Sequence, residues 1–210
     1  MTTPTAAPRT HRLPFTALNI RRILDGPKRM TRRPGFHPAV GDFIAATEPY
    51  YQRGSWQAVP GARTRTGLLK MQFVPARHEV RFERPTEPGW HKRHARFMPT
   101  RYSRLLLRVT ATKAERLQDI TEADALAEGI YAETWGNVRE QLADPERHPR
   151  YPLDMPVFVP PVEAEHAPVF ATAVEAFQHL WTSLYGADPV KGWAANPTVI
   201  ATSFEPVPTI

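Results

Sequence analysis

Arginine is the residue type in this sequence that points most clearly to a chemistry. Residues 1–108 hold 21 lysines and arginines against 6 acidic residues, whereas residues 109–210 hold 6 against 15. Only three of those 21 are lysines. A guanidinium group presents a planar fork of donors to phosphate oxygens and also stacks on bases. The charge pattern therefore favours a nucleic-acid or nucleotide partner, although pairing between the two halves of the chain would give the same asymmetry.

The basic side chains concentrate in two segments. The first is the sequence Lys-Arg-Met-Thr-Arg-Arg at 28–33, which we interpret as a turn closed by Pro34 and Gly35. The second, residues 77–104, interleaves aromatic residues with eight lysines and arginines, a pattern typical of a surface that binds single strands. Buried aromatic rings with solvated arginines are the alternative. The candidate nucleic-acid or substrate contacts from these segments are Arg29, Arg32, Arg33, Trp90, Arg101 and Arg104.

Several other chemistries are excluded or weakly supported. The chain has no cysteine, which excludes a disulfide scaffold, a thiolate zinc site, a cysteine nucleophile and an iron–sulfur cluster. His91 and His94 are separated by two cationic residues, so we expect no metal, and we expect no other cofactor. The sequence has no apolar run long enough for a membrane span or a signal peptide. We expect a soluble, cytoplasmic protein with no membrane contact.

Short elements have to position these residues, because 23 of the 210 residues are proline. Apolar periodicity predicts helices within residues 15–24, 117–130 and 169–185, and strands at 43–44, 68–74, 79–82, 102–112 and 198–204. Thr121 and Asp124 approximate a capping box, and Gly129 suits the end of that helix. The alternation favours one α+β domain with a curved sheet or small barrel over residues 13–210, after a flexible tail at 1–12.

Residues 23–33, Ile-Leu-Asp-Gly-Pro-Lys-Arg-Met-Thr-Arg-Arg, resemble the opening motif of ASCH domains, which belong to the PUA-like superfamily. Gly41-Asp42 before a strand and the segment 117–130 resemble two further motifs of the family. The longer phage and prophage type of the domain is similar at Phe97-Met98-Pro99, Ser103-Arg104, Leu180-Trp181 and 192–197. The resemblance covers roughly residues 14–206, with insertions at about 48–100 and 131–168.

The resemblance implies a small curved β-barrel flanked by short helices, with a cleft for RNA or a modified nucleoside. Some bacterial ASCH proteins are amidohydrolases that remove the acetyl group of N4-acetylcytidine with a lysine, a threonine and a glutamate. The matching positions are Lys28, Thr31 and Glu128. The alternatives are a non-catalytic RNA-binding module, a ribonuclease, or an interaction protein of phage morphogenesis with a phage protein as partner.

The implied chemistry is reasonable for these residue types. A threonine hydroxyl needs a base within about 3 Å to act as a nucleophile. Lys28 and Thr31 are close enough in sequence to meet, and burial beside the arginines would lower the pKa of Lys28. Glu128, at the end of its helix, would protonate the leaving amine. We predict that the turn at 28–33 and the helix end at Glu128 face each other across one positively lined hollow.

Overall fold

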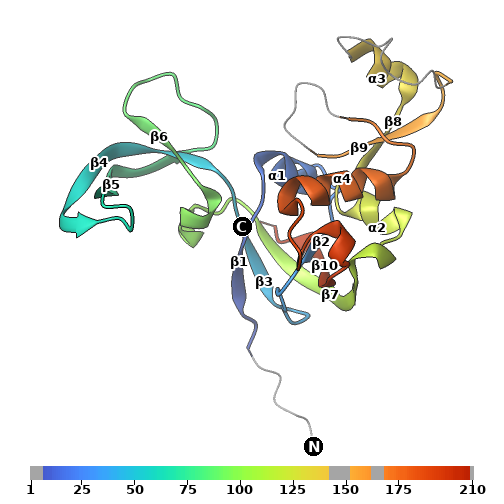
Figure 1. Ribbon diagram of the computed structural model, residues 1–210, viewed down its shortest axis with the longest axis horizontal. Coiled ribbons are helices and arrows are strands. Elements are labelled where there is room, and N and C mark those ends of the chain that lie inside the picture. The colour runs from blue at the N-terminus through green and yellow to red at the C-terminus, as the bar shows by residue number, and fades with distance from the viewer. Residues whose placement is uncertain (1–6, 142–151, 162–167, 209–210) are drawn as a thin grey trace, which may run out of the picture. The chain divides into compact units, whose positions relative to one another are not determined.

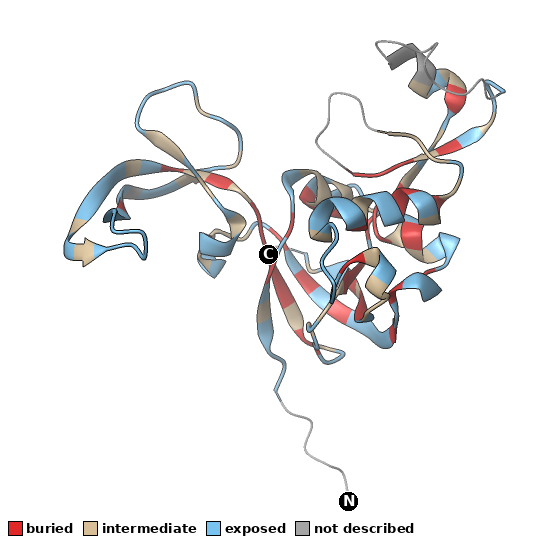
Figure 2. Cartoon of the chain, viewed as in Figure 1, coloured by how far each residue is buried: buried red, intermediate tan, exposed pale blue. Residues whose placement is uncertain are grey.

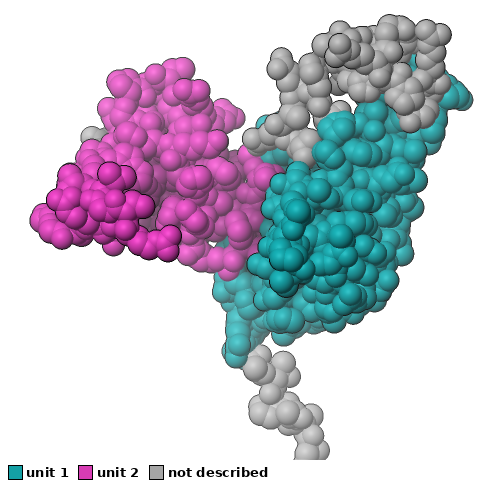
Figure 3. Space-filling view, in the orientation of Figure 1, with its two compact units in different colours: residues 1–11, 18–45, 105–210 teal, residues 12–17, 46–104 magenta. Residues whose placement is uncertain are grey.

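The computed structural model describes residues 7–141, 152–161 and 168–208 and divides the chain into two compact units, coloured in Figure 3. Unit 1 takes its described residues from Met1–His11, Leu18–Ala45 and Leu105–Ile210, and unit 2 consists of Arg12–Ala17 and Ala46–Arg104. Unit 2 contains the insertion predicted at about 48–100.

Unit 1 is organised around a five-stranded sheet with the order β1-β3-β7-β10-β2 (Figure 1). The strands are β1 (Thr10–Pro14), β2 (Met30–Arg33), β3 (Phe43–Thr47), β7 (Leu106–Arg116) and β10 (Thr198–Pro206). The mixed α+β class is confirmed. In the described residues the edge strands β1 and β2 do not pair with each other, so no closed barrel is seen.

Two sequence expectations differ from this sheet. Residues 28–33 were expected to form a turn, but Met30–Arg33 is an edge strand because its backbone pairs antiparallel with Ile200–Ser203 of β10. Thr10–Pro14 is a strand with Leu13 buried, so residues 10–12 of the tail predicted to be flexible belong to the sheet.

The helices of the described chain are α1 (Ala17–Leu24), α2 (Glu122–Ala127), α3 (Trp135–Gln141) and α4 (Ala173–Tyr185). The predicted capping box of α2 is confirmed, and Thr172 caps α4 in the same way. Short 3₁₀ turns are η3 (Leu117–Asp119) and η5 (Trp193–Ala195). None of the described helices has the length and apolar character needed to cross a bilayer.

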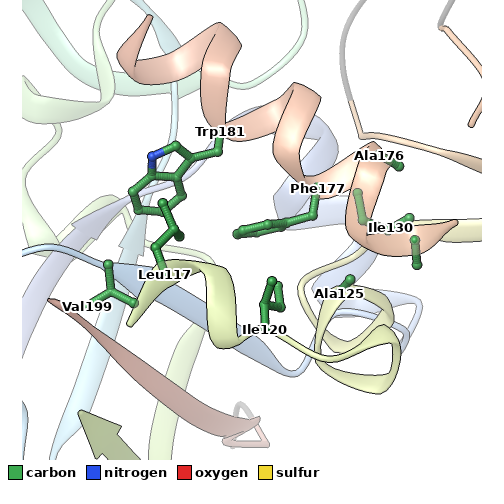
Figure 4. Close-up of a cluster of buried hydrophobic side chains, with 9 residues drawn as sticks. Leu117, Ile120, Ala125, Ile130, Ala176, Phe177, Trp181 and Val199 are labelled. Carbon is green, nitrogen blue, oxygen red and sulfur yellow. The ribbon is translucent and has the colours of Figure 1, made fainter. Parts of the chain in front are cut away.

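The core of unit 1 fixes α2 in place. Apolar side chains from η3, α2, α4 and β10 pack together as Figure 4 shows; they are Leu117, Ile120, Ala125, Ile130, Ala173, Ala176, Phe177, Trp181 and Val199. Trp181 Nε1 donates a hydrogen bond of 2.8 Å to the carbonyl of Lys191, which satisfies the one polar group of the indole. The C-terminal end of α2, where Glu128 lies, is therefore held by a packed core.

Strands β8 (Tyr131–Thr134) and β9 (Pro156–Val159) form a two-stranded sheet within the predicted insertion at 131–168, whose residues 142–151 and 162–167 lie outside the described part. Unit 2 is a three-stranded antiparallel sheet with the order β5-β4-β6. Its strands are β4 (Tyr50–Arg63), β5 (Leu69–Arg81) and β6 (Trp90–Arg93), followed by the turns η1 (Ala95–Phe97) and η2 (Thr100–Tyr102). The two strands predicted at 68–74 and 79–82 are one strand, because a register shift opposite Gln52/Gly54 lets β5 continue past Pro75.

Candidate functional site

Lys28 and Glu128 form a buried ion pair in unit 1. Lys28 Nζ lies 3.0 Å from Glu128 Oε2, and each residue is only 4% exposed. The backbone N–H of Arg29 donates to the carbonyl of Ala127 at 2.8 Å, which ties this segment to the end of α2. Gly129 permits the close approach, because a Cβ there would lie 3.3 Å from Lys28 Cβ and φ is +99°. The structure thus brings the 28–33 segment and the helix end into direct contact, whereas we predicted that they would face each other across a hollow.

Lys28 is fully hydrogen-bonded. Its ammonium donates to the carboxylate of Glu128, to the carbonyl of Glu128 at 2.5 Å and to the carbonyl of Met30 at 3.0 Å. An ammonium has three N–H donors, so these partners satisfy all of them. Burial lowers the pKa of Lys28 below its usual value; Glu128 opposes that shift, and the nearby Arg33 and Arg32 add to it. The predicted direction of the lysine pKa is confirmed.

Arg32 extends this network away from solvent. Its Nε donates to Glu115 at 2.9 Å, its Nη2 lies 2.9 Å from Asp124, and its Nη1 lies 3.5 Å from Glu128. Glu115 also pairs with Lys113 at 2.8 Å. Arg32, which we selected as a substrate contact, is therefore buried among carboxylates and positions Glu128. Sequence reasoning missed Glu115 and Asp124, because their meeting with Arg32 depends on strand register and on the packing of α2.

Thr31 is the predicted catalytic residue that the structure does not bring into this network. Within the described residues, its hydroxyl has no hydrogen bond to Lys28 or Glu128, and strand alternation directs its side chain away from the face of Arg32. Thr31 pairs across the sheet with Thr202, which pairs in turn with Thr112. Thr202 is fully buried, and its Oγ1 has no hydrogen-bond partner among the described groups.

A pocket of about 490 Å³ in unit 1 includes Lys28 in its wall. Arg29, one of the predicted contacts, also lines it, while its Nε donates to the carbonyl of Gly26 at 2.9 Å. The remaining lining is mostly apolar with a few polar groups: Ile23, Leu24, Gly26, Met30, Thr110, Ala127, Ser203, Phe204, Glu205 and Pro206. Neither Thr31 nor Glu128 lines this pocket, so Lys28 is the member of the predicted catalytic set that reaches it.

The remaining predicted contacts belong to different units of the chain. Arg33 lies half-buried at the end of β2 in unit 1, whereas Trp90, Arg101 and Arg104 belong to unit 2. The guanidinium of Arg81 lies 4.7 Å from the ring centre of Trp90. Arg101 stacks on the adjacent tyrosine ring, and Arg104 pairs with buried Glu48 at 2.9 Å, so its charge is already compensated.

No protein-family model matches the sequence, and neither the curated proteins nor the solved structures give a match. Within the described residues, no three histidine, aspartate or glutamate side chains are grouped so that they could hold a metal ion. The chemistry of the site therefore has to be inferred from its own residues.

Proposed function

We propose that unit 1 is an ASCH-type domain that binds RNA or a modified nucleoside, with a base entering the pocket beside Lys28. The carrying observation is the buried Lys28–Glu128 pair, whose lysine lies in the wall of a pocket of about 490 Å³. A buried ion pair usually stabilises a fold less than apolar side chains of the same size would. Ionisable groups with perturbed pKa values beside a pocket of this size are typical of functional sites.

The PUA-like barrel implied by the sequence motifs remains part of this proposal. The order β1-β3-β7-β10-β2 gives one continuous sheet, with α2 attached to it through the ion pairs of Arg32. In this proposal the sheet is the open part of such a barrel, and the pocket beside Lys28 is its ligand cleft.

The pocket supports hydrolysis of an exocyclic amide such as that of N4-acetylcytidine. The nucleophile is a water molecule in the pocket, because Thr31 does not line it. The water attacks the acetyl carbon and loses a proton to Lys28, which passes one of its own to Glu128, 3.0 Å away. The C–N bond then breaks, and the pair returns the proton to the leaving nitrogen. The products are acetate and cytidine. Lys28, at the pocket wall, is the group placed to hydrogen-bond the carbonyl oxygen during attack.

The test is the release of acetate from N4-acetylcytidine by the full chain. We expect Lys28→Met and Glu128→Gln to reduce turnover by about 10²-fold or more, since each removes a proton-transfer partner. Lys191→Ala is the matched control, because Lys191 is an exposed lysine of unit 1 outside the pocket. Thr31→Ala should retain turnover, because Thr31 does not line the pocket; loss of turnover would show that Thr31 takes part in the reaction. A wild-type chain that neither binds nor cleaves acylated nucleosides would refute the proposal for this pocket.

A binding module without catalysis is the second candidate. The observation that favours it is the engagement of all three N–H donors of Lys28, since a substrate carbonyl would have to displace one of them. In that case cytidine derivatives should protect unit 1 from thermal unfolding without being consumed. Finding no acetate but a ligand-dependent rise in the unfolding temperature would select this candidate.

A further inference from the structure

One guanidinium of unit 2 is surrounded by aromatic rings. Cζ of Arg93 lies 4.3 Å from the ring centre of Phe73, 5.1 Å from that of Trp56 and 5.5 Å from that of Phe97. Its Nε is buried and has no hydrogen-bond acceptor among the described residues. The ion pairs found in the described part of unit 2 involve Arg81 and Arg104 instead. Aromatic rings thus fix the orientation of the Arg93 guanidinium, and no acidic residue in the described part of unit 2 forms an ion pair with it.

The register of the sheet places these groups on one face. Arg93 pairs with Tyr50 and His91 with Gln52, while Trp56 pairs with Phe73. Because side chains alternate along a strand, His91 and Arg93 share one face of β6, opposite to that of its other two residues. His91 contacts Phe73 ring to ring at 5.6 Å, which joins β6 to the Trp56–Phe73 pair. We call the set Trp56, Phe73, His91, Arg93 and Phe97 the Arg93 face.

A glycine makes this face possible. A Cβ on Gly54 would lie 2.6 Å from Phe73 Cζ and 2.4 Å from the carbonyl oxygen of Val74. Only a residue without a side chain lets the phenyl ring cross β4 there. The rings at the margin of the face are open to solvent: Trp56 is 47% exposed and Phe97 is 51% exposed. Figure 2 shows how little of β4 and β5 is buried.

The charge of unit 2 indicates what this face binds. The residues of Arg12–Ala17 and Ala46–Arg104 include thirteen lysines and arginines against four glutamates. A ring-held guanidinium is a preorganised donor to phosphate oxygens, and an exposed indole is a platform for a base. A strand with unpaired bases offers both a phosphate and an open base face, whereas a duplex hides its base faces and an acidic peptide has none.

We propose that the Arg93 face binds single-stranded nucleic acid, with Arg93 donating to a phosphate and Trp56 stacking on a base. The inference rests on the proposed RNA binding and deepens it, because it assigns the contact with the polymer to unit 2. None of Trp56, Phe73, His91, Arg93 or Phe97 is among the contacts selected from the sequence.

The experiment measures anisotropy of a labelled, unstructured RNA of about 12 nucleotides, within the usual site size of such surfaces, with the full chain. We expect Trp56→Ala to weaken binding by about 5- to 150-fold and Trp56→Phe by much less, because a ring remains. Arg93→Gln should weaken binding and reduce the slope of log affinity against log salt by about 0.7, the loss of one phosphate contact on a single strand. Arg65→Gln is the control, an exposed arginine of the same unit and the same charge change; it should change affinity less than Arg93→Gln does.

The outcomes separate this inference from the proposed function. DNA of the same sequence should bind similarly, since neither contact uses the 2′-hydroxyl, and a hairpin duplex should bind more weakly. Equal losses in Arg65→Gln and Arg93→Gln, wild-type affinity in Trp56→Ala, or a preference for polyglutamate would overturn the inference. A wild-type chain that deacetylates the nucleoside but does not bind the RNA would refute only the binding proposed for the Arg93 face. A wild-type chain that binds the RNA but does not deacetylate the nucleoside would refute only the activity proposed for the Lys28 pocket. Circular dichroism of each variant shows whether it is folded.

Discussion

Removing both partners of the Lys28–Glu128 pair should destabilise the chain by less than the sum of the two single removals. Both residues are 4% exposed, so water cannot replace a lost partner. In Lys28→Met, the cationic partner that remains for Glu128 among the described residues is Arg32, whose Nη1 lies 3.5 Å from the carboxylate. Breaking a buried pair in this way costs about 3–5 kcal/mol. Glu128→Gln retains an acceptor for Lys28 and should cost about 2 kcal/mol, the value of a hydrogen bond to a charged group.

The double variant Lys28→Met/Glu128→Gln replaces the pair with neutral side chains of similar size. Replacing both members of a buried pair is often neutral for stability. The carbonyls of Met30 and Glu128 would still lose their donor, so the double variant should not reach wild-type stability. We expect a coupling of about 1–3 kcal/mol between the two substitutions, so the double change costs less than the sum of the single ones.

Urea unfolding followed by circular dichroism at neutral pH gives the four free energies of this cycle. Lys191→Met controls for the loss of a lysine at an exposed position of the same unit. Additive costs would show that the two side chains do not interact in solution. A Lys28→Met variant as stable as the wild type would show that Glu128 is not buried, and would refute the reasoning on which the pocket depends.

Further predictions concern other buried groups. Because burial lowers the pKa of Lys28 in the folded chain, Lys28 binds its proton more tightly in the unfolded chain. The free energy of unfolding of the wild type, relative to that of Lys28→Met, should therefore rise as the pH approaches 10.5. A difference that does not change with pH would contradict this. Hydrogen bonds, of which the one from the N–H of Arg9 has the largest effect, lower the pKa of Asp42 to about 2. At neutral pH the wild type should therefore be more stable than Asp42→Asn, and this difference in the free energy of unfolding should disappear as the pH falls from 3.8 through about 2. Gly54→Ala should cost about 1–3 kcal/mol by overpacking and speed hydrogen exchange in unit 2 but not in unit 1. Thr202→Val removes a buried hydroxyl without a partner and should raise the urea midpoint, with a gain of about 1 kcal/mol; a loss would show that the hydroxyl is bonded in solution.

Local signals were sufficient to predict α1, α2 and α4 but not α3, which lies in the predicted insertion. The Thr121 cap, the positive φ at Gly129 and the apolar stripe of α4 all act within a few residues, and each is present as expected. The apolar face of α4 is nevertheless not buried along its whole length, since Leu184 is 58% exposed. The meeting of Lys28 with Glu128, 100 residues apart, was predicted only through the resemblance to a known motif.

Strand pairing set the limit of prediction. The 28–33 segment carries no apolar alternation, and it becomes β2 only because β10, from the far end of the chain, supplies its hydrogen-bond partners. Once that strand exists, alternation sends Thr31 and Arg32 to opposite faces, which separates a predicted nucleophile from the carboxylates of α2. The long strand β4 was missed for the same reason, because its partners lie in β5 and β6.

The charge asymmetry of the sequence divides between the two units in a way that bears on function. Unit 1 holds fourteen basic and seventeen acidic residues, and its Arg32 and Arg108 pair with acids that follow them in the chain. There, the explanation by internal pairing accounts for the pattern. In unit 2 thirteen basic residues face four acids, so the excess charge is not neutralised. Unit 1, whose basic and acidic residues are nearly balanced, therefore suits an uncharged nucleobase in the Lys28 pocket. Unit 2, with its excess of basic residues, suits a polyanion on the Arg93 face.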